Sequence, residues 1–336
     1  MLENLLEVVN LKTSFFTHMG EVQAVRGISF ELKAGEVLGV VGESGSGKSV
    51  MSLSIMKLIE HPGKIKAGSI FFEGLDLIPM PEKEIQKIRG NSIAMVFQDP
   101  TAALNPVYTI GNQIVEAIMT HQKISKKEAH EKAIKMLKLV GIASPEHRIS
   151  SYPHEFSGGM RQRVMIAMAL SCEPKLLIAD EPTTSLDVTI QAQILSLLRR
   201  LKDDFNTSIM LITHDFGVVA EFCSRVIVMY GGLIVEEGTV DQIFYGSRHP
   251  YTLGLLKSIP NPHSQARKRL VPILGTPPDL IDPPSGCPFF PRCQYAMKIC
   301  SVQMPPSIEI MDGHKTHCWR MHPDAPEHTD LLKHNK

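Results

Sequence analysis

Residues 42–49 read Gly42-Glu43-Ser44-Gly45-Ser46-Gly47-Lys48-Ser49 and follow directly on the apolar run Val37–Val41. A strand that ends in a glycine-rich turn and opens a helix places several backbone N–H groups around one anion. Glycine permits the backbone angles and the close approach that a polyphosphate needs. We expect Lys48 to reach the β- and γ-phosphates and the Ser49 hydroxyl to ligate Mg²⁺. A chance Gly/Ser-rich turn is the alternative, but the flanking strand and the helical stretch Met51–Ile59 favour a nucleoside triphosphate site.

The composition is that of an ordinary globular protein. The chain has 336 residues, enough for about two domains, and is 43% hydrophobic and 21% charged. Lysine plus arginine and aspartate plus glutamate number 35 each, which argues against nucleic acid as a partner. No uncharged apolar run reaches the ~18 residues of a membrane span, and residues 1–20 lack a signal-peptide cleavage site. We therefore expect a cytosolic protein whose six cysteines are thiols or metal ligands.

The apolar pattern predicts alternating strands and helices. Strands are expected within residues 5–41 and at Ser69–Phe72, Ser92–Phe97, Leu176–Ala179, Ser208–Thr213 and Val226–Met229. Helical periodicity at Ile114–Met119 and Ala129–Leu139 indicates a helical insertion, and a further helix is expected at Val188–Lys202. Such alternation predicts an α/β core with a largely parallel sheet. Nine prolines within residues 259–291 break this pattern, so a domain boundary is predicted near residue 246.

Two acidic residues end the predicted strand that starts at Leu176. Asp180 is well placed to hold the Mg²⁺ shell, and Glu181 to polarise the attacking water as general base. The alternative is a solvated strand end with two surface carboxylates. The presence of a phosphate loop elsewhere in the chain favours the catalytic interpretation.

A second anion-binding pattern occurs at Ser157-Gly158-Gly159-Met160, which opens a predicted helix after Phe156. One nucleotide does not need two separate helix N-termini for its γ-phosphate, whereas a head-to-tail pair of chains does. With these residues the chain resembles the ATP-binding cassette family over residues 5–245, with the spaced motifs matching in order. The family's usual signature is Leu-Ser-Gly-Gly-Gln, so this chain departs from it at Phe156 and Met160.

The resemblance implies an α/β fold with four parts: a RecA-like phosphate-loop core, an antiparallel β subdomain, an inserted α-helical subdomain and a small irregular Cys-rich C-terminal domain. It implies the domain limits 1–98 and 161–245 for the core with its β subdomain, 99–160 for the helical subdomain and 246–336 for the C-terminal domain. The resemblance also implies a role for each motif. For the nucleotide, Phe15 or Phe16 stacks on adenine, Gly42 to Ser49 hold the phosphates, His214 contacts the γ-phosphate, Glu181 is the base, and Mg²⁺ is held by Ser49, Gln98 and Asp180. For the dimer, Ser157 to Met160 form the signature loop, and Ser185-Leu186-Asp187 link the two sites. Gln98, Glu181 and His214 are thus the expected catalytic residues, and Gln98 also senses the transmembrane partner.

Further stretches resemble a narrower group, the ATPases of oligopeptide and dipeptide permeases. They include Phe97–Pro100, Ala103–Pro106, Tyr152–Phe156, Ala179–Ile194 and His249–Pro260. The resemblance is to the D-type member, which implies a second, F-type ATPase, two permease subunits and an extracytoplasmic solute-binding protein as partners. It also implies a peripheral location on the cytoplasmic face of the cell membrane. Importers of nickel and glutathione belong to the same group, so nickel or another small solute stays open as cargo beside peptides.

Four cysteines form the pattern C-x₅-C-x₆-C-x₁₇-C: Cys287, Cys293, Cys300 and Cys318. Four thiolates suit either Zn²⁺ or an iron–sulfur cluster, and the long spacings favour the wider cluster. The resemblance to D-type ATPases implies a [4Fe–4S] cluster here, with Zn²⁺ and free thiols as alternatives. His314 and His317 are close enough in sequence to be rival ligands.

Two other functions compete with a transport ATPase. A soluble cassette ATPase acting on DNA or ribosomes usually has two cassettes in one chain or a coiled-coil insertion, and this chain has neither. A redox-sensing regulator would make the cysteine tail the main function and ATP hydrolysis secondary.

Overall fold

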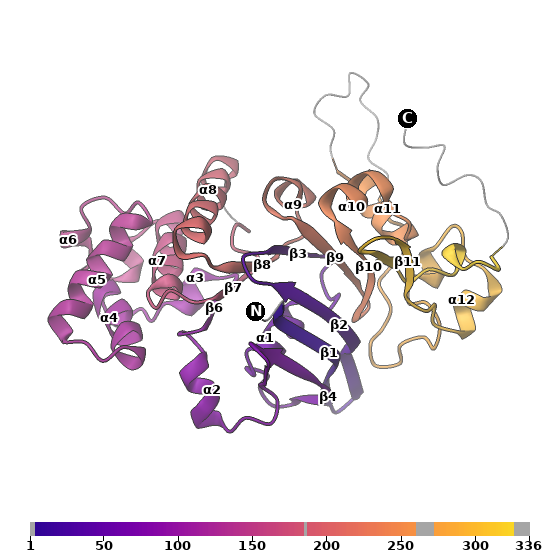
Figure 1. Cartoon of the computed structure of the whole chain (residues 1–336), viewed down its shortest axis with the longest axis horizontal. Coiled ribbons are helices and arrows are strands. Elements are labelled where there is room, and N and C mark those ends of the chain that lie inside the picture. The colour runs from indigo at the N-terminus through magenta and orange to yellow at the C-terminus, as the bar shows by residue number, and fades with distance from the viewer. Residues whose placement is uncertain (1–3, 185–186, 260–271, 326–336) are drawn as a thin grey trace, which may run out of the picture. The chain divides into compact units, whose positions relative to one another are not determined.

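The computed structural model describes residues 4–184, 187–259 and 272–325. Their contacts divide the chain into two compact units. The first unit comprises Met1–Leu5, Leu32–Val37 and Asp76–Ile212, and the second comprises Leu6–Glu31, Leu38–Leu75 and Thr213–Lys336. Figure 1 labels their helices and strands.

The first unit combines parallel strands with most of the helices. Strand β7 (Leu176–Asp180) pairs in parallel with β6 (Ile93–Val96) and β8 (Ser208–Ile212). Every residue of these strands is buried, which explains their continuous apolar runs. The helices are α2 (Glu82–Ile88), α3 (Pro100–Ala103), α4 (Ile110–His121), α5 (Lys126–Leu139), α6 (Pro145–Arg148), α7 (Gly158–Leu170) and α8 (Val188–Phe205), with a 3₁₀ turn at Pro153–Glu155.

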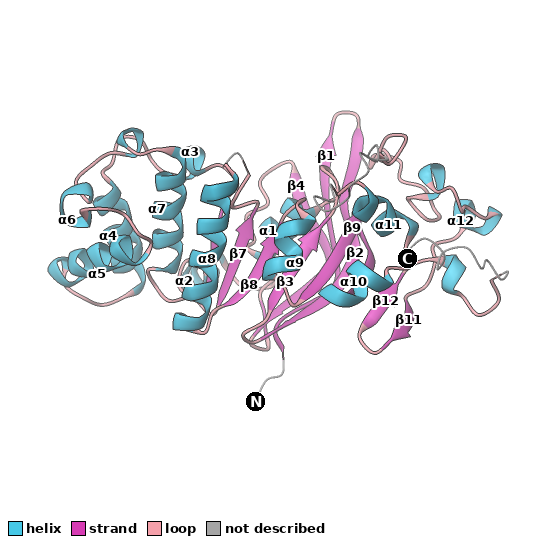
Figure 2. Cartoon of the chain, turned by 90° about the horizontal axis from the view of Figure 1, so that it is seen from above, coloured by secondary structure: helices cyan, strands magenta, loops and turns pink. Residues whose placement is uncertain are grey.

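The expected helical insertion is present as α4 to α7. Helix α4 includes the predicted Ile114–Met119 and α5 the predicted Ala129–Leu139, and α8 extends the helix predicted at Val188–Lys202. Ser125 and Glu128 form a reciprocal capping box that starts α5. Figure 2 shows α7 and α8 side by side in this unit.

The second unit contains two sheets. In one, β3 (Val37–Val41) pairs in parallel with β9 (Arg225–Tyr230), and β9 pairs antiparallel with β10 (Leu233–Thr239). The other has the order β2-β1-β4-β5, from Gly20–Lys33, Asn4–Thr17, Gly63–Phe72 and Leu75–Asp76. The helices are α1 (Lys48–Ile55), α9 (Phe216–Phe222), α10 (Val240–Gly246), α11 (Pro250–Lys257) and α12 (Lys298–Val302), with 3₁₀ turns at Phe290–Arg292 and Trp319–Met321.

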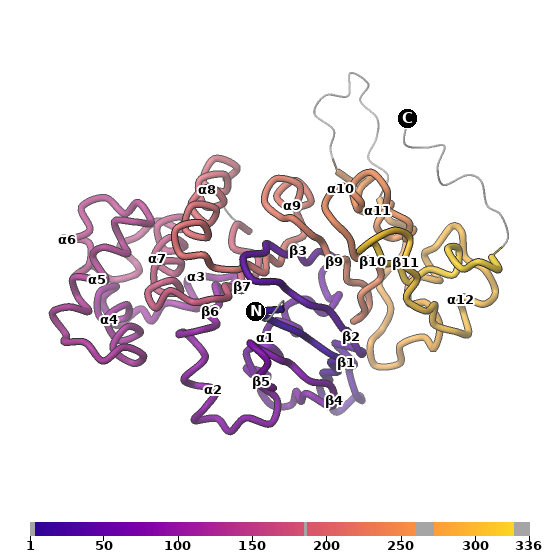
Figure 3. Tube along the Cα trace, viewed as in Figure 1, coloured from indigo at the N-terminus to yellow at the C-terminus, as the bar shows by residue number. Residues whose placement is uncertain are grey.

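The C-terminal segment departs from the expected separate, irregular domain, which is not confirmed. Its strands β11 (Ile308–Met311) and β12 (His314–Thr316) form a hairpin, and β12 pairs antiparallel with β10. Figure 3 shows this yellow hairpin beside β10. The core pairs β6–β7, β7–β8 and β3–β9 are parallel, as the sequence pattern predicted. Strand β10 and the hairpin add antiparallel pairs, and β1 pairs antiparallel with β4 in the other sheet.

One helix is shorter than predicted. The helix expected over Met51–Ile59 ends at Ile55, within α1. Lys57 adopts a left-handed backbone angle of φ 50°, which cannot continue a right-handed helix.

A hydrophobic cluster joins the C-terminal segment to β3 and β9. Tyr230, Tyr251 and Phe289 lie at its centre with ring centroids 4.4 to 5.4 Å apart, and all three are buried. Such aromatic pairs contribute about 0.5–1.5 kcal/mol each beyond the burial of their area. Cys287 packs in the same cluster, with Cys293 and Cys300 against it, so these three cysteines share one core with Val41 at the end of β3.

Candidate functional site

The phosphate loop, residues 42–49, has the geometry of an anion site. A Cβ atom at Gly42 would lie 2.2 Å from the Met229 carbonyl oxygen, and one at Gly47 would lie 2.4 Å from the Ala24 carbonyl oxygen. Only glycine fits at either position. Gly47 also precedes α1 without a side-chain cap, so the first N–H groups of α1 are not used by a capping side chain.

Lys48 is held across the loop by its own backbone. Its ammonium donates to the carbonyl oxygens of Gly42 at 2.7 Å and Glu43 at 2.9 Å, and lies 3.4 Å from the Ser46 hydroxyl. The side chain is buried, whereas Ser44, Gly45 and Ser49 are exposed. The loop thus holds one cation beside an uncapped helix N-terminus, which suits a polyphosphate.

Residues that the sequence analysis missed hold this loop from the C-terminal segment. The Glu43 N–H donates to the Tyr251 hydroxyl at 2.8 Å, and Arg292 donates to both carboxylate oxygens of Glu43 at 2.7 and 3.1 Å. Tyr251 and Arg292 lie 208 and 249 residues beyond Glu43, so no local pattern signals the contact.

The acidic strand end lies in the first unit. Asp180 closes β7 and is buried, and Glu181 follows it in the left-handed region at φ 47°. A glutamate there is uncommon, and such strained residues cluster at functional sites. Gln98 and Thr184 both donate to one Glu181 carboxylate oxygen, at 3.0 and 2.9 Å. The structure therefore brings the predicted Gln98 and Glu181 together.

His214 lies in the second unit, where it is exposed at the start of a turn. The preceding Thr213 donates its N–H to the Val40 carbonyl oxygen at 3.1 Å, which ties the turn to the strand that enters the phosphate loop. Asp215 caps α9 through Gly217 and Val218. These contacts fix the backbone on both sides of His214.

Ser157 to Met160 open α7 as predicted. The Ser157 hydroxyl accepts from the Met160 N–H at 3.3 Å, and Gly158 has open space where a side chain would project. Phe156 is buried, so a large apolar side chain is kept at the position where the family has leucine. The exposed serine and glycine face leaves room for a ligand or a partner chain.

The two phenylalanines expected near adenine differ in exposure. Phe15 is half-buried and close to Gly63, whereas Phe16 is 44% exposed with the Lys64 and Lys66 ammonium groups 6.0 and 5.8 Å from its ring. Phe16 is thus the more accessible ring for stacking. Asp187 caps α8 through the Ile190 N–H, while Ser185 and Leu186 lie outside the described residues.

The expected metal site is not confirmed. Across the described ranges, no group of three or more His, Cys, Asp or Glu side chains is arranged to hold a metal ion. The four cysteines nevertheless line one cavity of about 10 Å³, together with His249, Tyr295, Trp319 and Arg320. Burial raises the pKa of Cys287 and of Cys318 to about 12, with the other cysteines adding to the rise. The four cysteines are therefore free thiols around one small space, of which Cys287 and Cys318 are buried and Cys293 and Cys300 are half-buried.

The neighbours of this cavity differ from those expected. His314 is fully buried and its Nε2 lies 3.0 Å from the Glu236 carboxylate, so it is not among the residues lining the cavity. His317 does not line it either, whereas His249, which the sequence analysis did not consider, does. Burial lowers the pKa of His249 to about 3, so its ring is neutral.

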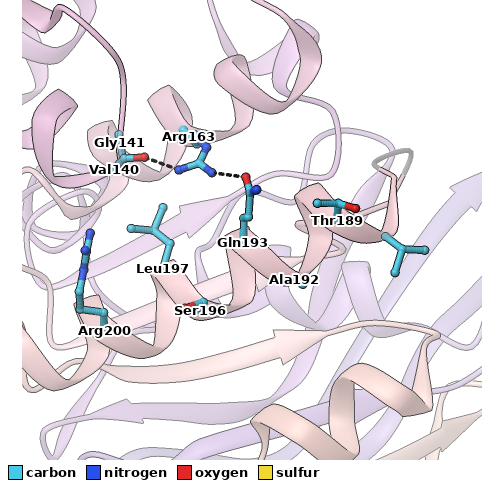
Figure 4. Close-up of a pocket in the computed structure, with 10 residues that line it drawn as sticks. Val140, Gly141, Arg163, Thr189, Ala192, Gln193, Ser196, Leu197 and Arg200 are labelled. Carbon is cyan, nitrogen blue, oxygen red and sulfur yellow. Dashed lines mark hydrogen bonds between the residues drawn. The ribbon is translucent and has the colours of Figure 1, made fainter.

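A larger cavity of about 720 Å³ lies in the first unit (Figure 4). It is formed by α7, α8 and the residues after α5, and Arg163 bridges it by donating to the Val140 carbonyl and to Gln193 at 2.6 and 2.9 Å. It is not lined by the phosphate loop, the acidic strand end or the cysteines. We therefore do not assign it to the nucleotide chemistry.

Comparison with known proteins gives matches over most of the chain. The ABC transporter family model matches residues 25–184, and the model for the oligopeptide/dipeptide transporter C-terminal region matches residues 235–300. The oligopeptide transport ATP-binding protein OppD of Bacillus subtilis is 58% identical over 96% of this chain and 90% of its own. The dipeptide transport ATP-binding protein DppD of the same organism is 52% identical over 95% of each chain, and Escherichia coli OppD is 50% identical over 94% and 93%.

Solved structures agree with these sequence matches. A dimeric ATP-binding cassette in a post-hydrolysis state with ADP and phosphate is 27% identical, with a TM-score of 0.64 over 70% of this chain and 98% of its own. A component of an ABC transporter complex from Clostridium perfringens is 30% identical, with a TM-score of 0.62 over 73% and 92%. Within the described residues, no helix combines the length and apolar character needed to cross a bilayer.

Proposed function

The chain belongs to the ABC transporter family, and we propose that it is the ATP-hydrolysing subunit of an importer for oligopeptides or dipeptides. One observation carries this proposal above the others. The chain has a phosphate loop with the buried Lys48 and the uncapped helix α1, and it is more than half identical to peptide-transport ATP-binding proteins along nearly its whole length. The peptide cargo is supported by the match to the oligopeptide/dipeptide C-terminal region.

We assign the nucleotide chemistry to the residues described above. The phosphate loop binds the triphosphate, with Lys48 reaching its β- and γ-oxygens. Ser49, Gln98 and Asp180 serve the Mg²⁺ shell, and Glu181 activates the attacking water. Its contacts with Gln98 and Thr184 support this role because they fix the direction of the carboxylate. The aromatic partner of adenine is Phe15 or Phe16, of which the exposed Phe16 is favoured.

The remaining assignments concern assembly. The signature loop, Ser157, Gly158, Gly159 and Met160, completes the nucleotide site of a second ATPase, of F type. In the same dimer Asp187 belongs to the link between the two nucleotide sites, and His214 contacts the γ-phosphate. This assembly is supported by the dimeric cassette among the similar structures. We place it at the cytoplasmic face of the membrane, on two permease subunits that receive peptide from an extracytoplasmic binding protein. The finer fold assignment, a RecA-like core with β and helical subdomains, belongs to the same proposal.

Transport assays test the function. The chain, its partner ATPase and the permeases are reconstituted in vesicles, and ATP hydrolysis is measured with the binding protein. Peptide is expected to stimulate hydrolysis, and Ni²⁺ is not. Lys48→Ala serves as the control, because it removes the cation of the phosphate loop. Stimulation by Ni²⁺ and not by peptide would reassign the cargo, and full activity of Lys48→Ala would refute the nucleotide site.

A second proposal is that the cysteine cavity holds a [4Fe–4S] cluster. Four cysteines around one space supply a complete ligand set. Arg320 lines the same cavity, is buried, and has two guanidinium nitrogens, Nε and Nη1, without a hydrogen-bond partner among the described residues. A buried arginine suits an anionic occupant. The cavity of about 10 Å³ is only large enough for one water molecule, so the cysteine segment would have to open to admit a cluster between the four sulfur atoms.

When bound, the cluster would supply four metal–thiolate cross-links to a segment with few regular elements. Anaerobic purification is expected to give brown protein with about four irons per chain, as a Cys₄-held [4Fe–4S] site implies. Cys300→Ser should lose the iron and keep ATP binding. A colourless anaerobic preparation without iron, with or without one zinc, would contradict the cluster.

A further inference from the structure

Arg292 of the cysteine segment forms a forked contact with one residue of the phosphate loop, Glu43. Its side chain is only 4% exposed, and its five N–H donors match five hydrogen bonds. Two go to the carboxylate of Glu43, one to the Tyr230 hydroxyl, and two to the carbonyl oxygens of Leu274 and Ile273. Every donor of this guanidinium is therefore committed in one arrangement.

Glu43 is held at three points. Arg292 binds its carboxylate, the Tyr251 hydroxyl accepts from its N–H at 2.8 Å, and its carbonyl oxygen accepts from the Lys48 ammonium at 2.9 Å. The orientation of the peptide at Glu43 thus sets one of the contacts that direct Lys48. A chain of direct contacts runs from the cysteine segment, residues 287–318, to the cation of the phosphate loop.

We propose that Arg292, together with Tyr251, is a positioning residue for ATP binding, so that the cysteine segment tunes the affinity of the phosphate loop for nucleotide. The proposal rests on the assignment of this loop to ATP. Two effects act together. The forked guanidinium of Arg292 fixes the backbone of the glycine-rich phosphate loop. Its positive charge also neutralises the Glu43 carboxylate, which would otherwise repel the polyphosphate that the loop binds.

The two effects predict different rescue patterns. Arg292→Met leaves the Glu43 carboxylate uncompensated, so the dissociation constant for MgATP should rise about 2- to 150-fold, the range that the interaction energies of contacting pairs in double-mutant cycles correspond to. Adding Glu43→Gln removes the repelling charge and should bring the dissociation constant of the double variant close to that of Glu43→Gln alone. Arg292→Lys should not restore affinity, because lysine lacks the planar fork.

The measurement is MgATP titration of the purified full chain by calorimetry, with the thermal midpoint recorded for each variant. Arg225→Met is the matched control. Arg225 pairs with Glu237 at 3.6 Å and donates to the Glu31 carbonyl in the same unit, and both of these partners lie outside residues 42–49. Its loss should leave the ATP affinity within about twofold of wild type, because distant sites act independently.

Each outcome decides the inference. A folded Arg292→Met protein with wild-type affinity would overturn it, as would strictly additive effects of the two substitutions. If Arg292→Met does not fold, Tyr251→Phe decides: it removes only the hydroxyl that accepts from Glu43, and an unchanged dissociation constant would then overturn the proposal. Lys48→Ala separates a failure of the nucleotide-site assignment from a failure of the role proposed for Arg292. Wild-type affinity in that variant would refute the nucleotide site itself, whereas lost affinity there with normal Arg292→Met would refute only the role of Arg292.

Discussion

Replacing Glu181 by glutamine isolates the role of its negative charge. The Glu181 carboxylate accepts hydrogen bonds from Gln98 at 3.0 Å and Thr184 at 2.9 Å through one oxygen, and a glutamine oxygen in the same place can accept both. The side chain keeps its shape and loses its capacity to take a proton from water.

The structure bounds the two effects of this change. A hydrogen bond to a charged group contributes about 1 kcal/mol more than a neutral one, so two such bonds cost at most about 2 kcal/mol of stability, and less at this half-buried position. Loss of a general base lowers the rate about 10²- to 10⁴-fold, which is roughly 3–5 kcal/mol of transition-state stabilisation. Turnover should therefore fall at least ~100-fold while the protein stays folded and binds MgATP.

The assay is ATP hydrolysis by the reconstituted complex. The phosphate-loop lysine of the partner ATPase is substituted, so that the partner's site is inactive and only this chain's site contributes. MgATP affinity is measured on the same preparation. Thr184→Val is the graded control, because it keeps the carboxylate and removes one of its two donors. We expect Thr184→Val to lower the rate of ATP hydrolysis about tenfold, because one lost hydrogen bond costs about 1 kcal/mol or slightly more. Near-normal turnover of Glu181→Gln with intact binding would refute the assignment of the base.

Three further predictions concern single positions. Gly47→Ala should weaken MgATP binding at least about fivefold, because alanine in the left-handed region costs about 1–3 kcal/mol and its Cβ would meet the Ala24 carbonyl oxygen at 2.4 Å; unchanged affinity by calorimetry would argue against a rigid loop. Phe16→Ala should weaken ATP binding about 2- to 12-fold through lost stacking, whereas Phe15→Ala should mainly lower the thermal midpoint, and the reverse result would place Phe15 on the adenine. Glu236→Ala should destabilise the chain by about 3–5 kcal/mol, because Glu236 is fully buried and accepts from His314 and from the N–H groups of Arg248 and His249; a thermal midpoint within a degree of wild type would contradict this.

Local patterns in the sequence predicted the elements and motifs well. The buried strands around Leu176 and Ser208 were readable because both of their faces are covered, which leaves an unbroken apolar run. The phosphate loop was readable because glycine at positions 42 and 47 answers a local steric need. Only the family resemblance implied that Gln98 and Glu181 serve one site, and their direct contact across 83 residues was not predicted.

Pairings over long distances in the sequence could not be predicted. The antiparallel pairing of Glu236 with Thr316 depends on a register that neither strand specifies alone. His314 was expected as a rival metal ligand, but its ring instead pairs with the buried Glu236 carboxylate. A buried carboxylate without a hydrogen-bond donor is costly, so this pairing stabilises the fold. The fork between Arg292 and Glu43 is of the same kind: each residue has an ordinary local sequence, and only the fold joins them.

The contacts of Glu43 give the C-terminal region a direct part in nucleotide binding. A loop with glycine at positions 42, 45 and 47 has a large conformational entropy when free, and ordering it opposes ligand binding. Tyr251 and Arg292 reduce that cost by fixing Glu43 before ATP arrives. Tyr251 and Arg292 both fall within residues 235–300, the stretch that matches the oligopeptide/dipeptide transporter C-terminal region. That region therefore contacts the phosphate loop directly, and a substitution that breaks the contact of Arg292 or Tyr251 with Glu43 should weaken the loop's affinity for ATP.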